Sequence, residues 1–209
     1  MKKLRLLPFI LLIFIYGCQK DEVTTEEPQF KYDQIKPSNR YDPSYAQQWM
    51  IQAYNSVRSR GFFALDASRL YSYTALTMYE SMVYGNPNGL SMEGQLKNFN
   101  NLPKPTPNKR YDWGMVLCHA TPRVLIHMLQ GANFTTLQEI TNLERTQERR
   151  LRLETDLPDD VIDNSKEFAV ALADYIINYA DGDRTREALG RSYTMPSIAV
   201  NPANYDGIE

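Results

Sequence analysis

The stretch 67–84 constrains the fold more than any other part of the chain, because apolar and small residues would cover most of the circumference of a helix there. Residues three and four apart share one side of a helix, and the apolar positions recur at that spacing on more than one side. Such a helix has to be covered by neighbours on several sides. The sequence therefore predicts that 67–84 is the central helix of a bundle and that it ends at Gly85.

Four further stretches carry the helical period, with apolar residues gathered on one side. The connection at 86–110 is rich in proline and asparagine and is predicted to be irregular. No segment repeats along the chain. We predict an all-α fold, a helical bundle of about five helices with long loops. The further helices are expected at 43–59, 112–130, 136–153 and 158–181.

Local signals refine the ends of these helices. Pro122 lies inside 112–130 and is expected to kink or break that helix, because proline lacks a backbone donor. Thr136 and Glu139 have the spacing of a capping box and predict the start of 136–153. The chain has no clear period after Gly190, where two further prolines predict an extended tail.

The N-terminus has the order of a secretory signal. Residues 1–5 are basic, residues 6–16 are apolar, and Gly17 and Cys18 follow. A run of about 11 apolar residues is shorter than the roughly 20 that a membrane-spanning helix needs, but it suits a signal sequence. Gly17-Cys18 resembles the lipobox of bacterial lipoproteins. This resemblance implies a signal peptide over 1–17, and Cys18 acylated on its thiol and on its new amino group, which together anchor stably.

The residues after Cys18 predict a location and a domain plan. Residues 19–22 resemble the acidic export signal of surface lipoproteins in the Bacteroidetes. Gln19, where an aspartate would resemble retention in the inner membrane, makes the chain similar to lipoproteins that are retained in the outer membrane. We therefore expect a lipoprotein of the outer membrane in the cell envelope, exposed on the surface and bound to the membrane through its lipid anchor. Residues 18–41 are polar and are expected to form a flexible tether, with the helical domain at 42–209.

Charge excludes one class of partner. Without the signal peptide the chain carries 20 basic against 25 acidic residues. Non-specific binding of nucleic acid depends on lysine and arginine that neutralise phosphates, so this body is not expected to bind nucleic acid.

Few residues are candidates for chemistry. The chain has two cysteines and two histidines, too few for a multi-cysteine or multi-histidine metal cluster. His119 and His127 are eight apart rather than four, so we expect structural roles for both. Cys118 and His119 are adjacent on one helix, so their side chains point in different directions and cannot form a nucleophile–base pair. A catalytic Cys118 would need a base from elsewhere in the chain, such as His127.

Glu80 lies among apolar residues and is expected to be a buried hydrogen-bonding group that holds the bundle together, with a catalytic role as the alternative. The sequence assigns no catalytic, cofactor-binding or metal-binding residue.

Several segments together resemble a known family. The stretch ASRLYSYTALTMYES at 67–81, SMEGQL at 91–96, the proline-rich 102–107 and YDW at 111–113 resemble the bacterial vanadium-dependent haloperoxidase-like proteins. These belong to the type 2 phosphatidic acid phosphatase superfamily. The opening helix around 49–57 matches as well, so the resemblance covers roughly residues 41–185.

The resemblance implies a helical bundle whose oxyanion site lies in the C-terminal half. In the family that site combines a lysine, an Arg-Pro, a Ser-Gly-His and a final arginine with a histidine, which neutralise vanadate or phosphate. This sequence contains neither Arg-Pro nor Ser-Gly-His, so no catalytic residue is carried over. Vanadate, or phosphate as a substrate, is implied for the full-length family and not as a ligand of this chain.

Two functional hypotheses follow. The first is the N-terminal scaffold portion of a lipid-anchored haloperoxidase-like or acid-phosphatase-like enzyme, an incomplete half of a larger helical domain. A missing C-terminal half or another partner would then cover apolar faces of 67–84 and 158–181. The alternative is a helical outer-membrane lipoprotein that acts as a binding module, with 86–110 and the tyrosines as its contact surface. The sequence does not distinguish phosphatase from haloperoxidase, and it specifies no substrate, halide preference or oligomeric state.

Overall fold

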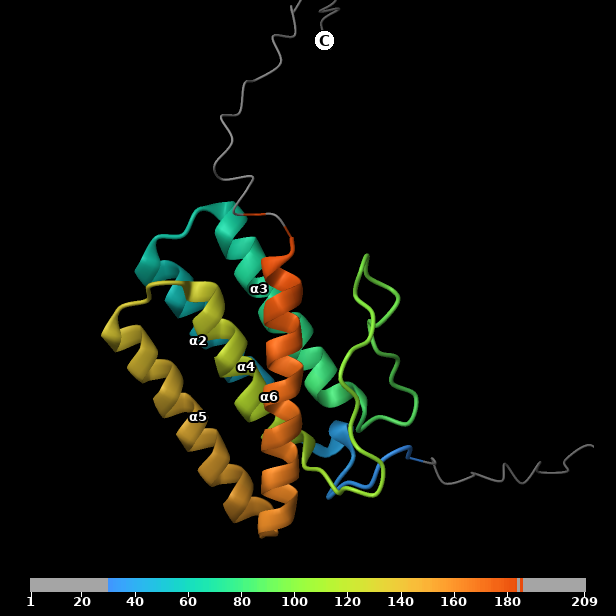
Figure 1. Ribbon diagram of the computed structural model, residues 1–209. Helices are drawn as coiled ribbons and strands as arrows, with labels where there is room; N and C mark the ends of the chain where they lie inside the picture. Colours follow the sequence, from blue (N-terminus) through green and yellow to red (C-terminus); the bar gives the residue numbers. More distant parts are fainter. Residues whose placement is uncertain (1–29, 184, 186–209) are drawn as a thin grey trace, which may run out of the picture.

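The protein is an all-α bundle, as predicted. The computed structural model describes residues 30–183 and 185 (Figure 1). Within these residues the only β-structure is an isolated bridge between Gln34 and Tyr111. Each expected helix is present within a few residues of its predicted ends. After the 3-10 turn η1 (Ser38–Arg40) come α2 (Ser44–Arg60), α3 (Ala64–Val83), α4 (Trp113–Leu129), α5 (Phe134–Thr155) and α6 (Asp159–Asp181).

The N-terminal predictions fall mostly outside the described residues. The apolar run 6–16, the expected signal peptide and Cys18 all precede residue 30. Among the residues that the structure does describe, no helix is long and apolar enough to cross a membrane.

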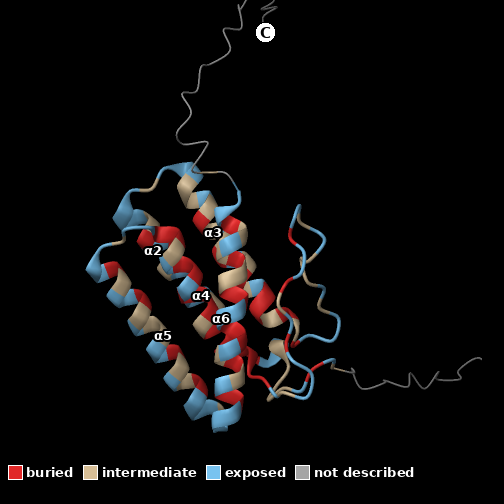
Figure 2. Ribbon diagram, viewed as in Figure 1, coloured by how far each residue is buried: buried red, intermediate tan, exposed pale blue. Residues whose placement is uncertain are grey.

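The central helix is α4, not α3. Thirteen of the 17 residues of α4 are buried, and α4 contacts each of the other four helices. In Figure 2, α5 shows exposed, intermediate and buried residues in turn along its length, as expected for a helix that packs on one side. The prediction that 67–84 is central was wrong because one side of α3 faces solvent, where Leu65 is 60% and Tyr79 45% exposed. The serines and alanines on that side tolerate exposure as well as burial.

A buried aspartate fixes the start of α4. The Asp112 side chain accepts hydrogen bonds from the Met115 backbone at 2.8 Å and from the Tyr41 hydroxyl at 2.8 Å. The Asp112 backbone N–H donates to Ser165 Oγ of α6 at 2.9 Å. Burial raises the pKa of the Asp112 carboxyl, although both accepted hydrogen bonds oppose that shift. This one residue therefore joins the segment before α2, the first turn of α4 and α6.

Two predicted helix signals act differently in the structure. Pro122 is buried within α4, and the helix continues through it from Trp113 to Leu129, so the expected break was wrong. The cap of α5 is Asn133, whose side chain accepts from Thr136 N at 2.8 Å. Thr136 is instead a buried residue of the first turn, so the predicted capping box was also wrong.

The expected tether is ordered over its second half. Tyr32 and Tyr41 are buried in the core. Ile35 N donates to Tyr111 O at 2.9 Å, and Tyr111 N donates to Asp33 O at 3.1 Å. Residues 30–41 are therefore packed on the bundle, which corrects the prediction of a flexible tether over that range. The polar composition concealed the two tyrosines that anchor it.

Aromatic side chains pack at the start of α4 and leave room for only a glycine at position 85. Tyr111 stacks on Trp113 with ring centroids 5.4 Å apart, and Phe168 meets Trp113 edge to face. Gly85 is buried beneath this cluster, and a Cβ at that position would overlap Ser38 Oγ and the Trp113 ring. Gly85 thus permits a close approach of the backbone in addition to ending α3.

We expect Gly85→Ala to lower the free energy of unfolding by about 1–3 kcal/mol, because overpacking forces the Trp113 ring or the backbone to move. Urea unfolding followed by far-ultraviolet circular dichroism measures the change. Gly182→Ala is the matched control, since its Cβ would make only ordinary contacts and its φ is −80°. The control should change stability by no more than about 0.5 kcal/mol. Equal stability of the two variants would contradict the close approach at Gly85.

Candidate functional site

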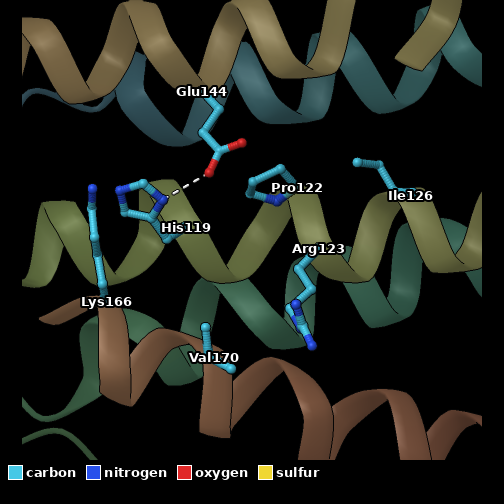
Figure 3. A pocket seen from close by; sticks show the side chains of 7 residues that line it. All are labelled: His119, Pro122, Arg123, Ile126, Glu144, Lys166 and Val170. Atoms are coloured by element: carbon cyan, nitrogen blue, oxygen red, sulfur yellow. Dashed lines mark hydrogen bonds and ion pairs between the residues drawn. The ribbon is translucent and has the colours of Figure 1, made fainter. Parts of the chain in front are cut away.

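The candidate site is a hollow between α4, α5 and α6. Its volume is about 450 Å³. Figure 3 shows α4 supplying most of the lining, with one side chain reaching from α5 and two from α6. The lining residues are His119, Pro122, Arg123, Ile126, Glu144, Lys166 and Val170.

His119 bridges two carboxylates of α5. Its Nδ1 lies 2.7 Å from Glu144 Oε1, the pair joined by the dashed line in Figure 3, and its Nε2 lies 3.5 Å from Glu148 Oε2. Glu144 and Glu148 are four residues apart and so face the same side of α5. The His119 side chain is only 13% exposed. The hydrogen bond at Nδ1 therefore orients the imidazole and joins α4 to α5, while Nε2 is buried without a hydrogen-bond partner.

Glu148 is the centre of an ion-pair network. Glu148 Oε1 lies 2.8 Å from Lys166 Nζ of α6 and 2.7 Å from Arg152 Nη2. Burial alone would raise the pKa of the Glu148 carboxyl, but the hydrogen bonds from Lys166 and Arg152 outweigh it, and the pKa is lowered. Three helices thus meet at a single carboxylate.

Cys118 is inert in this arrangement. The residue is fully buried, and its Sγ donates to the Glu144 backbone carbonyl at 3.3 Å. Burial and the nearby carboxylates of Glu144 and Glu148 raise the pKa of the thiol. A thiol that stays protonated is a poor nucleophile, so Cys118 does not serve as one in this fold.

His127 lies apart from this network. Its Nε2 is 3.0 Å from Asp181 Oδ1 on α6, whereas His119 pairs with α5. The two histidines are therefore held by carboxylates of different helices. Within residues 30–183 and 185, no group of three His, Cys, Asp or Glu side chains could hold a metal ion.

Glu80 secures a loop instead of joining two helices. It is fully buried and accepts from Met92 N at 2.6 Å and from Ser91 Oγ at 3.0 Å. Burial raises the pKa of the Glu80 carboxyl, partly offset by these two donors. The prediction of a buried hydrogen-bonding residue was right, but its partners belong to the irregular segment after α3. Glu80 does not line the hollow between α4, α5 and α6.

Sequence reasoning did not single out Glu144, Glu148 and Lys166. Charges of both signs follow one another along 144–152, and about half of the residues of α5 are exposed. The usable signal was the i, i+4 pair Glu144 and Glu148, which places two acids on one side of the helix. The sequence did not show that this side meets His119.

The basic side chains that line the hollow are already paired with carboxylates. Lys166 is held by Glu148, and Arg123 Nε lies 2.7 Å from Asp174 Oδ1. Binding of a tetrahedral or bipyramidal oxyanion needs cations whose charge is not taken by a carboxylate. The two acids around His119 would also repel such an anion. The lining of this hollow therefore does not fit vanadate or phosphate, and the hollow acts as an ion-pair junction between helices.

We expect Glu148→Gln to lower the free energy of unfolding at neutral pH by about 1–2 kcal/mol, because it removes charged hydrogen bonds to Lys166 and Arg152. A carboxyl with a lowered pKa stabilises the fold above its ordinary pKa, and that stabilisation is lost as pH falls through the lowered value. The difference from the unmodified chain should therefore shrink below about pH 4.

Urea midpoints at neutral and acid pH measure this difference. The matched control is Glu167→Gln on α6, because Glu167 also pairs with a lysine but is 72% exposed. Its effect should stay within about 0.5 kcal/mol at both pH values. A Glu148→Gln cost that is independent of pH would contradict the role of the ionised carboxylate.

Comparison with known proteins supports the fold. No family model matches the chain, and no curated protein matches it. A solved structure described as the first bacterial vanadium-dependent iodoperoxidase is similar, with 17% sequence identity and a TM-score of 0.61. The match covers 73% of this chain and 35% of that chain, so this chain spans only about a third of the length of that protein. The chain therefore shares a haloperoxidase-like helical fold with one part of that structure.

Proposed function

We propose that this chain is the N-terminal scaffold portion of a haloperoxidase-like or acid-phosphatase-like enzyme. The observation that carries the proposal is the match in fold to about a third of a vanadium-dependent iodoperoxidase. Under this proposal the reacting groups lie in sequence beyond the described bundle, and the bundle supports them. Vanadate as a cofactor, or phosphate as a substrate, belongs to that further part.

The charges in the described residues support this division. Lys166, Arg123 and Arg152 each form an ion pair with a carboxylate of α5 or α6. Releasing one of them to bind an anion would leave a partly buried carboxylate without its partner, which is unfavourable. An oxyanion site is therefore better supplied by other residues.

An exposed apolar surface beside the hollow fits a further helical segment. Ile126 is 38% and Val170 42% exposed, and both line the hollow next to the buried Pro122. Apolar side chains flanked by paired charges are typical of a surface that packs against another element of the same protein. This supports a contact on the α4–α6 side of the bundle.

The proposed location is the outer membrane. The lipobox-like Gly17-Cys18 motif supports a lipid anchor, and residue 30, where the described chain begins, lies about 12 residues after it. A chain of about 12 residues spans at most roughly 40 Å. The bundle would then stay close to the membrane surface, with the membrane as its partner through Cys18.

The alternative of a binding module has lost part of its support. The hydroxyls of Tyr79, Tyr175 and Tyr179 donate to backbone carbonyls of the irregular segment between α3 and α4. The hydroxyls of these three tyrosines therefore hold the loop. The scaffold proposal therefore stands ahead of the binding module.

The coding DNA beyond the codon for Glu209 provides the first test. We expect an open frame that encodes Lys, Arg-Pro, Ser-Gly-His and Arg/His segments. The longer product should bind orthovanadate and either oxidise iodide or bromide with peroxide or hydrolyse a phosphomonoester. The 209-residue chain should do neither, because it lacks the Arg-Pro and Ser-Gly-His motifs and because Arg123 and Lys166 at its hollow are already paired with carboxylates. A stop codon directly after Glu209, or a longer product that does not bind vanadate, would move the binding module to first place.

The exposed apolar surface gives a second test within this chain. We expect the full chain to bind anilinonaphthalene sulfonate, and Ile126→Asp with Val170→Asp to weaken the dye fluorescence. The two substitutions should cost little stability, since both side chains are partly exposed. Ile51→Asp is the control, because Ile51 is 58% exposed but belongs to α2 and does not line the hollow. A chain that melts cooperatively, stays monomeric and binds no dye would count against the scaffold proposal.

A further inference from the structure

A polar hollow lies where the irregular segment between α3 and α4 meets α6. Its volume is about 670 Å³, within the range of roughly 300–1,000 Å³ that is usual for small-molecule sites. Every lining residue except the glycine carries a polar group. The lining residues are Tyr73, Lys97, Asn98, Asn178, Tyr179, Gly182 and Asp183.

The loop wall of this hollow is held in place by aromatic side chains. Phe99 is fully buried and packs edge to face on Tyr179 of α6, with ring centroids 4.8 Å apart. The Tyr179 hydroxyl donates to the backbone carbonyl of Lys97 at 3.0 Å. Lys97 and Asn98 therefore stand on a fixed base, and a wall that is already ordered reduces the entropy cost of binding a ligand.

Two side-chain amides face this hollow from different elements. Asn98 of the loop and Asn178 of α6 are exposed, and neither side chain has a hydrogen-bond partner among the described residues. A carboxamide offers one acceptor oxygen and two donor hydrogens. Each hydroxyl of a sugar is likewise both a donor and an acceptor, so two neighbouring hydroxyls can pair with one amide. The hydrogen-bonding groups of the hollow thus match a polyhydroxylated ligand.

The tyrosine rings supply the apolar contact that such a ligand also needs. Tyr73 and Tyr179 meet edge to face, with ring centroids 6.1 Å apart, and both are half-buried. Their hydroxyls are already used, because Tyr73 donates to Asp183 Oδ2 at 3.1 Å and Tyr179 donates to the loop. The part of each ring that remains accessible is apolar and can contact the C–H groups of a sugar ring.

The charges of the lining favour an anionic group on the ligand. Asp183 Oδ2 lies 2.7 Å from Arg69 Nε, so the negative charge of this carboxylate is compensated. Lys97 forms no ion pair with a carboxylate of the described residues. The ammonium of Lys97 is therefore available to a carboxylate of the ligand.

We propose that this hollow binds an acidic sugar, with its hydroxyls on the amides of Asn98 and Asn178 and its carboxylate beside Lys97. The inference goes beyond the scaffold proposal, because it gives the described bundle a ligand of its own. It also concerns a different face, since none of these residues lines the hollow between α4, α5 and α6.

Saturation-transfer NMR with the full chain tests this inference. The probes are a trisaccharide of galacturonic acid and the matching neutral trisaccharide of galactose. We expect the acidic probe to bind with a Kd of about 1 mM or tighter, and the neutral probe about threefold more weakly, as for one exposed charge pair. Lys97→Gln should remove this preference. Equal binding of the two probes by the unmodified chain, or no binding of either at about 10 mM, would overturn the inference.

Two substitutions at the amides locate the binding. Asn98 has a φ of 62°, so Asn98→Gly removes the amide without straining the backbone, and Asn178→Ala suits an exposed helix position. Together they should weaken binding of the acidic trisaccharide about tenfold. Asn108→Gly is the matched control, because Asn108 is an exposed loop residue with a φ of 65° that does not line the hollow.

The control should bind as the unmodified chain does. Circular dichroism of each variant shows whether the bundle is folded, so that a loss of binding is read only from folded protein. Binding that is undiminished in the folded double variant would overturn the inference, as would an equal loss in Asn108→Gly.

Discussion

The burial of most of α4 is the constraint on which the rest of the structure depends. A helix of 17 residues with 13 buried positions can satisfy its own backbone internally, but its first turn leaves free N–H groups. Asp112 supplies the acceptor, and its own charge is buried in doing so. Tyr41 and Ser165 complete the hydrogen bonding of this residue from two other parts of the chain. The position of α4 thus determines where α6 and the segment before α2 have to lie.

The irregular segment between α3 and α4 follows from the same requirement. A long loop without helix or strand has many backbone polar groups to satisfy. Here Glu80 accepts from the backbone of Met92, and the hydroxyls of Tyr79 and Tyr179 donate to loop carbonyls. Asn98, Asn101 and Asn108 take positive φ values of 60–65°, a conformation that asparagine tolerates better than most residues. The loop is therefore ordered by side chains of the helices that flank it.

Helical periodicity predicted the fold class and the five helices because it depends on local spacing alone. It did not predict which helix is central, since α3 and α4 are both largely apolar and only their neighbours distinguish them. The N-cap of α5 is Asn133 and not the predicted Thr136, because the helix begins about one turn before the predicted capping position. The junction of His119, Glu144 and Lys166 needed knowledge of which faces of three helices meet. Tyr32 and Tyr41 were hidden in a polar stretch whose average composition favoured disorder.

The completeness of the core bears on what a further half of the protein could contribute. Trp49 and Trp113 are fully buried, and α4 has neighbours from every other helix. A bundle of this kind does not need another domain to close its core. Any additional half would instead pack on a preformed surface, and that contact would resemble an interface between domains, more polar than a core. The hollow beside α4 matches that description, because Ile126 and Val170 stand there next to charges that are already paired. Because Arg123 and Lys166 at this hollow are already paired, the surface can receive an oxyanion-binding half without competing for its ligand.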